Sequence, residues 1–363
     1  MATAVCGVIV NQCQWDILRK CIRGETLKPL PVALIVDSPW IPGYLGLSTL
    51  DYLTLPEVWL EANLKIRREF PEVIFLPGFW VEPGMAAEPS AFGCKISFFP
   101  DKTPAAHPLI ETPAEGERLG TPNPLTDGLM PLILNWYRFL EPRIEEAGEQ
   151  VKIVAARGPL TVATHLMGVT NFLMGLKLDP AGTHRLLEKT TALVRDWIEA
   201  QAGVLHAVEG ILVLDDIAGF LSLKDYRQFA HPYLKQVFDA FPGLVKMFHN
   251  DTDNPVSFAE LPDLRIDLFN FTHLQSLAKV RELVGPSLCL MGNVPPLEVL
   301  VRGDRESVMG AARACLSAHR GRPGLLLSAG GGTSPGTPGS NIQALVDASR
   351  ETGRAEASRP QET

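Results

Sequence analysis

The sequence is poor in charged residues and has no basic segment. Charged residues make up only 20% of the 363 residues, and the formal net charge is −8. A nucleic-acid-binding surface needs a stripe of lysine and arginine, and the densest candidate, Arg67 and Arg68, has acidic neighbours. We therefore expect a small-molecule substrate or a protein partner, and no nucleic acid.

Long apolar runs and paired cysteine motifs are also missing. No run approaches the ~18–20 apolar residues of a membrane span, and the short apolar stretch within residues 1–13 lacks the basic segment that opens a signal peptide. The six cysteines form no Cys-x-x-Cys pair. Cys94 and Cys289 lie in apolar runs, which favours buried free thiols in a reducing compartment. We expect a cytoplasmic protein that makes no contact with a membrane.

Continuous short apolar runs recur along the chain, with helical patterns between them. Such runs are typical of parallel strands covered on both faces, and repeated strand–helix units indicate an α/β fold. We predict strands at 33–38, 73–78, 94–99, 151–158, 210–216, 244–250, 266–272, 288–294 and 325–331.

A glycine-rich fingerprint after the first strand, usual in a doubly wound sheet, is absent. A strand count near eight or nine, with polar residues at the strand ends, instead favours a (β/α)8 TIM barrel. We predict a single barrel domain over residues 1–350, with an N-terminal extension and a long irregular excursion near 100–150. A polar C-terminal tail is predicted at 351–363.

Polar and aromatic side chains follow most of the predicted strands. In a TIM barrel the C-terminal ends of the strands meet at one mouth, where the catalytic residues lie. The candidates are Asp37, Trp40, Trp80, Arg157, Asp215, His249, Asn250, Asp251, Asn293 and Gly331.

His249 and Asp251 are the sharpest of these candidates. Alternate residues of an extended segment point to the same side, so the imidazole and the carboxylate can bind one metal ion together. A third ligand from another strand would complete an open catalytic site. The alternative is that Asp251 or Asp253 caps the helix expected after it, and the spacing alone does not decide between the two.

Asp215 and Asp216 are adjacent, so they point to opposite sides of a strand. We expect Asp215 to face the cavity, where it would bind a ligand, accept a proton or orient the substrate. Asp216 is then expected to form an ion pair or to cap a helix.

Three further candidates each have a plainer alternative. Arg157 would suit a carboxylate or phosphate at the mouth, or it forms a salt bridge. The glycine-rich stretch around Gly331 would offer backbone N–H groups to an anion, or it is a plain turn. Trp40 and Trp80 would form an apolar wall for a planar ligand, or they pack in the core.

Four segments keep the order and spacing of one known superfamily across residues 151–350. They are VAARGPLTVATHLMG, LDDIAGFLSLKDYRQFAHPYLKQVFDAFP, GNVPPLEVLVRGDRESV and LLLSAGGGTSPGTPGSNIQALVDASR. They resemble the uroporphyrinogen decarboxylase-like superfamily, and the N-terminal third matches only loosely. The resemblance implies a (β/α)8 barrel with one of two chemistries. One is cofactor-free decarboxylation of tetrapyrrole acetate arms, and the other is methyl transfer between a corrinoid cobalt and a small molecule.

The decarboxylase branch carries an early arginine-rich segment that this chain lacks. No arginine occurs between Arg23 and Arg67. Since a substrate with many carboxylates needs cationic partners, the sequence does not favour true uroporphyrinogen decarboxylation.

The chain resembles more closely the branch of the methylcobalamin:coenzyme M methyltransferases. That branch holds zinc with His-x-Cys and with a cysteine in a closing Gly-Cys-Gly. Here His249 keeps the histidine position, whereas Asp251 and Gly331 stand where the cysteines would be. A histidine–aspartate set is harder than a thiolate set, so it suits oxygen or nitrogen groups, or it binds no metal.

We therefore predict a methyltransferase acting between a small non-thiol substrate and a corrinoid on a separate partner protein. Its catalytic residues would be Asp37, Asp215, His249 and Asp251, with a divalent metal such as zinc on His249 and Asp251. Arg157, Asn250, Asn293, Trp40, Trp80 and Gly331 would bind the substrate. The alternatives are a decarboxylase or lyase acting on a carboxylated substrate and a non-catalytic tetrapyrrole or corrinoid binder. A homodimer is left open.

Overall fold

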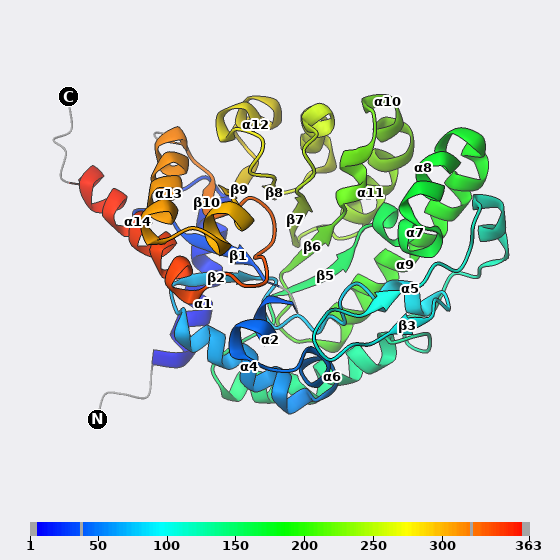
Figure 1. Ribbon diagram of the computed structural model, residues 1–363, viewed down its shortest axis with the longest axis horizontal. Coiled ribbons are helices and arrows are strands. Elements are labelled where there is room, and N and C mark those ends of the chain that lie inside the picture. Colours follow the sequence, from blue (N-terminus) through cyan, green and yellow to red (C-terminus); the bar gives the residue numbers. More distant parts are fainter. Residues whose placement is uncertain (1–5, 37–38, 320–321, 358–363) are drawn as a thin grey trace.

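Eight parallel strands form one sheet that is nearly closed into a barrel, with helices around it (Figure 1). The computed structural model describes residues 6–36, 39–319 and 322–357. The strands are β1 (Val32–Ile35), β2 (Val73–Leu76), β5 (Ile153–Arg157), β6 (Gly210–Leu214), β7 (Val245–Asn250), β8 (Leu268–Phe271), β9 (Cys289–Val294) and β10 (Leu325–Ala329). Their order is β2-β1-β10-β9-β8-β7-β6-β5, which confirms the predicted (β/α)8 TIM barrel.

Eight of the nine predicted strands are barrel strands, and the prediction for 94–99 is wrong. In this segment β3 (Ile96–Ser97) pairs antiparallel with β4 (Ala105–Ala106) in a separate two-stranded sheet. The segment therefore adds no strand to the barrel, and Phe98 is exposed, although Cys94 and Ile96 pack with the main apolar core. Cys94 and Cys289 are buried free thiols, as predicted.

Helices and short turns of helix connect the strands. The α-helices are α1 (Cys6–Ile22), α2 (Trp40–Leu45), α3 (Thr49–Thr54), α4 (Pro56–Glu69), α5 (Ala87–Ala91), α6 (Met130–Glu146), α7 (Pro159–Met167), α8 (Val169–Leu178), α9 (Pro180–Val204), α10 (Leu223–Asp225), α11 (His231–Asp239), α12 (Leu277–Val284), α13 (Arg305–His319) and α14 (Gly339–Ala357). The 3-10 segments are η1 (Pro113–Arg118), η2 (Asp216–Phe220) and η4 (Pro255–Leu264), and η3 (Tyr226–Ala230) and η5 (Pro296–Val301) are π-helical. Among the described helices, none is long and apolar enough to cross a membrane.

Two predicted irregular segments contain more helix than expected. The predicted excursion near 100–150 is irregular only in its first part, because α6 occupies residues 130–146. Proline in the first turn suits a helix start, although Pro142 also lies inside α6. Residues 351–357 of the predicted tail continue α14, and residues 358–363 lie outside the described part.

The interior of the barrel is filled by alternate residues of the strands, and α1 closes its N-terminal end. Trp15, Leu18 and Cys21 of α1 belong to the same apolar cluster as the inward residues of the strands. Trp15 Nε1 donates to Glu209 Oε2 at 2.8 Å, just before β6, and Cys21 Sγ lies 3.1 Å from the Leu325 carbonyl at the start of β10. The predicted N-terminal extension is therefore a plug, and it leaves the C-terminal mouth as the end where polar side chains gather.

Candidate functional site

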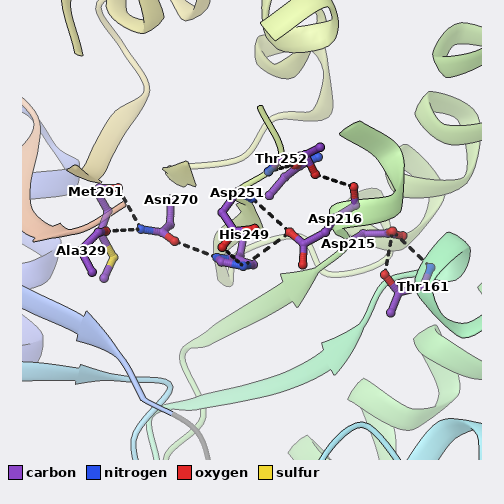
Figure 2. Close-up of polar contacts among 10 residues, drawn as sticks. Thr161, Asp215, Asp216, His249, Asp251, Thr252, Asn270, Met291 and Ala329 are labelled. Carbon is purple, nitrogen blue, oxygen red and sulfur yellow. Dashed lines mark hydrogen bonds and ion pairs between the residues drawn. The ribbon is translucent and has the colours of Figure 1, made fainter. Parts of the chain in front are cut away.

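An imidazole and two carboxylates meet at the C-terminal ends of β6 and β7 (Figure 2). His249 Nε2 lies 3.5 Å from Asp216 Oδ1 and 4.0 Å from Asp251 Oδ2. The Asp251 backbone N–H donates to Asp216 Oδ1 at 3.1 Å, which ties the two strand ends together. One ligand atom from each of the three side chains lies within 4.8 Å of the others. We call Asp216, His249 and Asp251 the mouth cluster.

The alternation of the strands explains why these three residues point the same way. Leu214 and Met247 belong to the apolar cluster inside the barrel. Because side chains alternate along a strand, His249 follows Met247 on the inner face and Asp251 comes next. By the same alternation, Asp216 follows Leu214 on the inner side of the barrel. The register pairs Leu214 with His249, so the two strand ends are level.

The orientation predicted for the aspartate pair is wrong. The Asp215 side chain is 0% exposed and turns to the N-terminus of α7. It accepts hydrogen bonds from the backbone N–H groups of Leu160 (2.9 Å) and Thr161 (3.2 Å) and from the Thr161 hydroxyl (2.9 Å). Burial raises the pKa of Asp215 to about 7 in spite of these bonds. Asp215 therefore anchors α7, and Asp216 is the aspartate that joins His249.

Asn270 on β8 is a site residue that the sequence analysis missed. Its Nδ2 donates to the carbonyls of Met291 (2.9 Å) and Ala329 (3.3 Å), and its Oδ1 lies 2.7 Å from His249 Nδ1. Since Nδ2 is bound to two acceptors, Oδ1 is the atom that faces the ring, and Nδ1 must carry the proton. In the neutral imidazole the lone pair is then on Nε2, which faces the two carboxylates. The available signal was a polar residue two positions after inward-facing Leu268.

These residues fit a divalent metal ion. An imidazole Nε2 and two carboxylate oxygens make the three-ligand set of an open catalytic zinc site, and the amide behind His249 supplies the usual outer hydrogen bond. Burial raises the pKa of Asp251, the neighbouring His249 opposes that effect, and Asp216 adds to it. A cation among the three groups would relieve the repulsion between the carboxylates.

Gly331, after β10, lies directly against Asp251. A Cβ atom on Gly331 would come 2.5 Å from Asp251 Oδ2, and the residue has a φ of +124°. The Asp251 carboxylate thus occupies the space that a side chain at 331 would need. The closing strand reaches the mouth cluster as predicted. Gly331 has no side chain that could bind a metal or a substrate, and its lack of a Cβ atom leaves space for the Asp251 carboxylate.

The helix-cap alternative for the aspartates after β7 is wrong. Asn254 is the N-cap of η4, and its side chain accepts from the Val256 backbone N–H at 3.3 Å. Asp253 Oδ1 instead accepts a hydrogen bond from the Gln275 side chain. Asp251 therefore does not cap η4, and its carboxylate lies in the mouth cluster beside His249.

Arg157 ends β5 on the inner face of the barrel and is buried. Its guanidinium pairs with Glu82 and lies 5.0 Å from the centre of the Trp80 ring, which is half-buried. The salt-bridge alternative for Arg157 therefore holds, but the pair is buried rather than at the surface. Arg157 and Trp80 close the barrel wall between β5 and β2, the two ends of the strand order.

The other predicted site residues have local partners. Asn250 is buried, and its Oδ1 accepts from the Thr252 N–H at 3.0 Å. Asn293 donates to the Gln275 carbonyl at 2.7 Å. Trp40 packs in the core, stacks on Tyr44 with ring centres 4.9 Å apart and donates to the Thr337 carbonyl. Asp37 lies outside the described residues.

Comparisons with known proteins identify the family of the chain. Residues 17–352 match the model of the family described as uroporphyrinogen decarboxylase (URO-D). A uroporphyrinogen decarboxylase of Thermodesulfovibrio yellowstonii is 29% identical over 342 residues, covering 90% of this chain and 95% of that protein. A methylated-thiol–coenzyme M methyltransferase of Methanosarcina mazei is 26% identical over 275 residues, covering 74% of this chain and 71% of that protein.

Two solved structures support the fold. A methyltransferase from Methanosarcina mazei superposes with a TM-score of 0.79 and 22% identity, covering 93% of this chain and 98% of that one. A B12-independent methionine synthase from Shewanella gives a TM-score of 0.61 with 12% identity, covering 90% and 98% of the two chains. With the family match over residues 17–352, the conclusion is that this chain belongs to the uroporphyrinogen decarboxylase family, whose enzymes include decarboxylases and methyltransferases.

Proposed function

We propose that this enzyme moves a methyl group between a small non-thiol substrate and a corrinoid carried by a separate protein. The observation that carries the proposal is the mouth cluster, where an imidazole and two carboxylates take the place of a thiolate set. Hard nitrogen and oxygen donors favour a substrate that presents oxygen or nitrogen. Methoxy compounds and methylamines are the substrate classes that meet this requirement.

The residues of the mouth cluster have distinct parts in this reaction. A divalent metal held by Asp216, His249 and Asp251 would supply Lewis-acid polarisation of the substrate heteroatom when bound. Asn270 keeps the His249 Nε2 lone pair directed at that position. With the metal bound, Asp251 would stay ionised as its ligand, and the proton that the heteroatom takes up as it leaves would come from water.

The atoms balance for transfer from an ether to cobalt. The methyl carbon forms a bond to cob(I)alamin, which supplies the electron pair, and the carbon–oxygen bond breaks. The oxygen leaves with the bonding pair and takes a proton, so the products are methylcob(III)alamin and an alcohol. In the opposite direction the alcohol gives up this proton to water.

A decarboxylase acting on a smaller acid is the second candidate. It is favoured by the raised pKa of Asp251, because a protonated carboxyl at the mouth can deliver the proton that replaces carbon dioxide. Arg157 does not strengthen this candidate, since its guanidinium already pairs with buried Glu82.

Free cob(I)alamin, standing in for the protein-bound corrinoid, separates the two candidates. With methanol, methylamine or guaiacol as donor, we expect the visible spectrum to change to that of methylcob(III)alamin, and the rate to fall at least about 100-fold in His249→Ala. A thioether donor, methylthioethanol, should react no faster than the uncatalysed control. Release of labelled carbon dioxide from a carboxylic acid without any cobalamin would favour the decarboxylase and contradict the proposal.

A further inference from the structure

A second group of side chains that can bind a metal lies at the opposite end of the barrel from the mouth cluster. Glu141 and Glu145 are four residues apart near the end of α6, and His206 lies in the connection between α9 and β6. Because α6 leads into β5 and this connection leads into β6, both lie where the barrel strands begin. One ligand atom from each side chain lies within 4.8 Å of the others. We call Glu141, Glu145 and His206 the α6 cluster.

The distances in the α6 cluster suit a metal ion better than a hydrogen bond. His206 Nδ1 lies 3.4 Å from Glu141 Oε2 and 3.6 Å from Glu145 Oε1. An N–H···O hydrogen bond is shorter, at roughly 2.7–3.2 Å. In a tetrahedral zinc site with bonds of about 2.0–2.1 Å, neighbouring ligand atoms are roughly 3.3–3.4 Å apart. The nitrogen is therefore spaced from both oxygens almost as the ligands of one ion are.

Glu141 has an oxygen that is available to a ligand. Its side chain is only 5% exposed, and Oε1 accepts the His206 backbone N–H at 2.6 Å, which fixes this segment against α6. Oε2 forms no hydrogen bond with the described residues, and it is not enclosed by protein atoms. It faces the His206 and Glu145 side chains, which are 75% and 41% exposed. An ion can therefore reach Oε2 from solvent.

The charge balance of the α6 cluster also favours a cation. In the described part of the chain, neither Glu141 nor Glu145 pairs with a lysine or an arginine, and their ion pairs are with His206. An imidazole carries at most one positive charge, so it does not balance two carboxylates, one of which is buried. The carbonyl groups at the C-terminal end of α6 add partial negative charge. A divalent cation compensates these charges together.

We propose that the α6 cluster binds a divalent cation of the zinc type, which joins α6 to the connection between α9 and β6. The ligands are His206 Nδ1, Glu141 Oε2 and Glu145 Oε1, a nitrogen and two oxygens that suit Zn²⁺. Among the described residues no side chain holds the His206 ring as Asn270 holds that of His249. The α6 cluster is therefore the weaker site, and limiting Zn²⁺ fills the mouth cluster first. The proposal does not depend on methyl transfer, because the two clusters share no residue.

Titration with Zn²⁺ alone tests this site. By calorimetry we expect two steps in the wild type, with the second at least about tenfold weaker than the first. His206→Ala and Glu145→Gln should each lose the second step and keep the first, and the fold should tolerate both changes because these side chains are exposed. His249→Ala should lose the first step and keep the second. Glu146→Gln is the matched control, since it removes the neighbouring exposed carboxylate of α6 and should keep both steps.

Thermal unfolding gives a second readout. In His249→Ala, where the mouth cluster is disabled, Zn²⁺ should raise the melting temperature, because an ion that bridges two segments binds only the folded chain. Adding His206→Ala to this variant should remove the rise. A single binding step that His206→Ala removes would support this site and contradict the metal site at the mouth. Absence of saturable Zn²⁺ binding in His249→Ala, or binding and stabilisation that survive the further change His206→Ala, would overturn the proposal.

Discussion

At the scale of single residues, the mouth cluster depends on which nitrogen of His249 carries the proton. Asn270 decides this, because its Nδ2 is committed to the carbonyls of Met291 and Ala329, and its Oδ1 therefore accepts from Nδ1. Removing the hydrogen-bond partner of a metal-binding histidine typically lowers metal affinity by about 10- to 100-fold.

Asn270→Leu should lower affinity for Zn²⁺ by about 10- to 100-fold. In ¹⁵N NMR of the metal-free wild type, the His249 Nδ1 should have the shift of a protonated nitrogen, and the variant should show a mixture of tautomers. Asn293→Leu is the matched control, because Asn293 also lies at the mouth but donates to Gln275 rather than contacting His249. Equal zinc affinity in wild type and Asn270→Leu would count against this role.

Gly331 and Asp251 compete for one volume, so their substitutions should not be additive. Gly331→Ala places a Cβ against the carboxylate at a backbone conformation that non-glycine residues rarely adopt, and we expect a loss of about 1–3 kcal/mol. Asp251→Gly removes the clash but not the backbone strain, so the same change should cost less by about 0.5 kcal/mol or more in that background. Urea denaturation of the four variants in the cycle measures this coupling, and strict additivity would refute the shared volume.

At the scale of elements, the exit of β6 sends its two aspartates to different neighbours. Asp216 joins His249 on β7, while Asp215 accepts three hydrogen bonds at the start of α7. The alternation rule gives the right answer only when the inward-facing set is known. In strands that are apolar on both faces, the sequence does not reveal which residues face inward. The prediction that Asp215, and not Asp216, faces the cavity is wrong for this reason. Asn270 was missed for the same reason.

The raised pKa of Asp215 predicts a definite sign of pH dependence. The pKa of Asp215 in the folded state, about 7, is above the ordinary aspartate pKa of 3.8, so the folded state holds more protons between these values. The contribution of Asp215 to the free energy of unfolding is therefore greatest below about pH 4 and declines as pH rises to about 7. The size of the decline is on the order of 1–4 kcal/mol.

Denaturation of wild type and Asp215→Asn between pH 4 and 8 measures this decline. The free energy of unfolding of the wild type, relative to the variant, should fall across that range, since asparagine does not titrate. Thr161→Ala keeps the titrating group but removes a hydrogen bond that lowers its pKa, so the decline should persist and extend to higher pH than in the wild type. Parallel curves for wild type and Asp215→Asn would mean that the carboxyl is not titrating as described.

At the scale of the whole molecule, the barrel has one plugged end and one polar end. Helix α1 fills the N-terminal end with Trp15, Leu18 and Cys21, and the mouth cluster lies at the other end. The sequence pattern predicted all eight barrel strands and the polar side chains that follow them, because buried parallel strands are continuous apolar runs that end in polar residues. The ion pair of Arg157 with Glu82 joins residues 75 positions apart, and the sequence contains no signal for such a pairing.

Metal content of the purified protein tests the central claim most directly, namely that Asp216, His249 and Asp251 form one divalent metal site. By inductively coupled plasma mass spectrometry after dialysis against limiting Zn²⁺, we predict about one metal ion per chain in wild type. His249→Ala and Asp216→Asn should both lose it, and Asp215→Asn should retain it because that side chain turns to α7. A wild-type protein that binds no metal, or a metal retained in His249→Ala and lost in Asp215→Asn, would contradict the account.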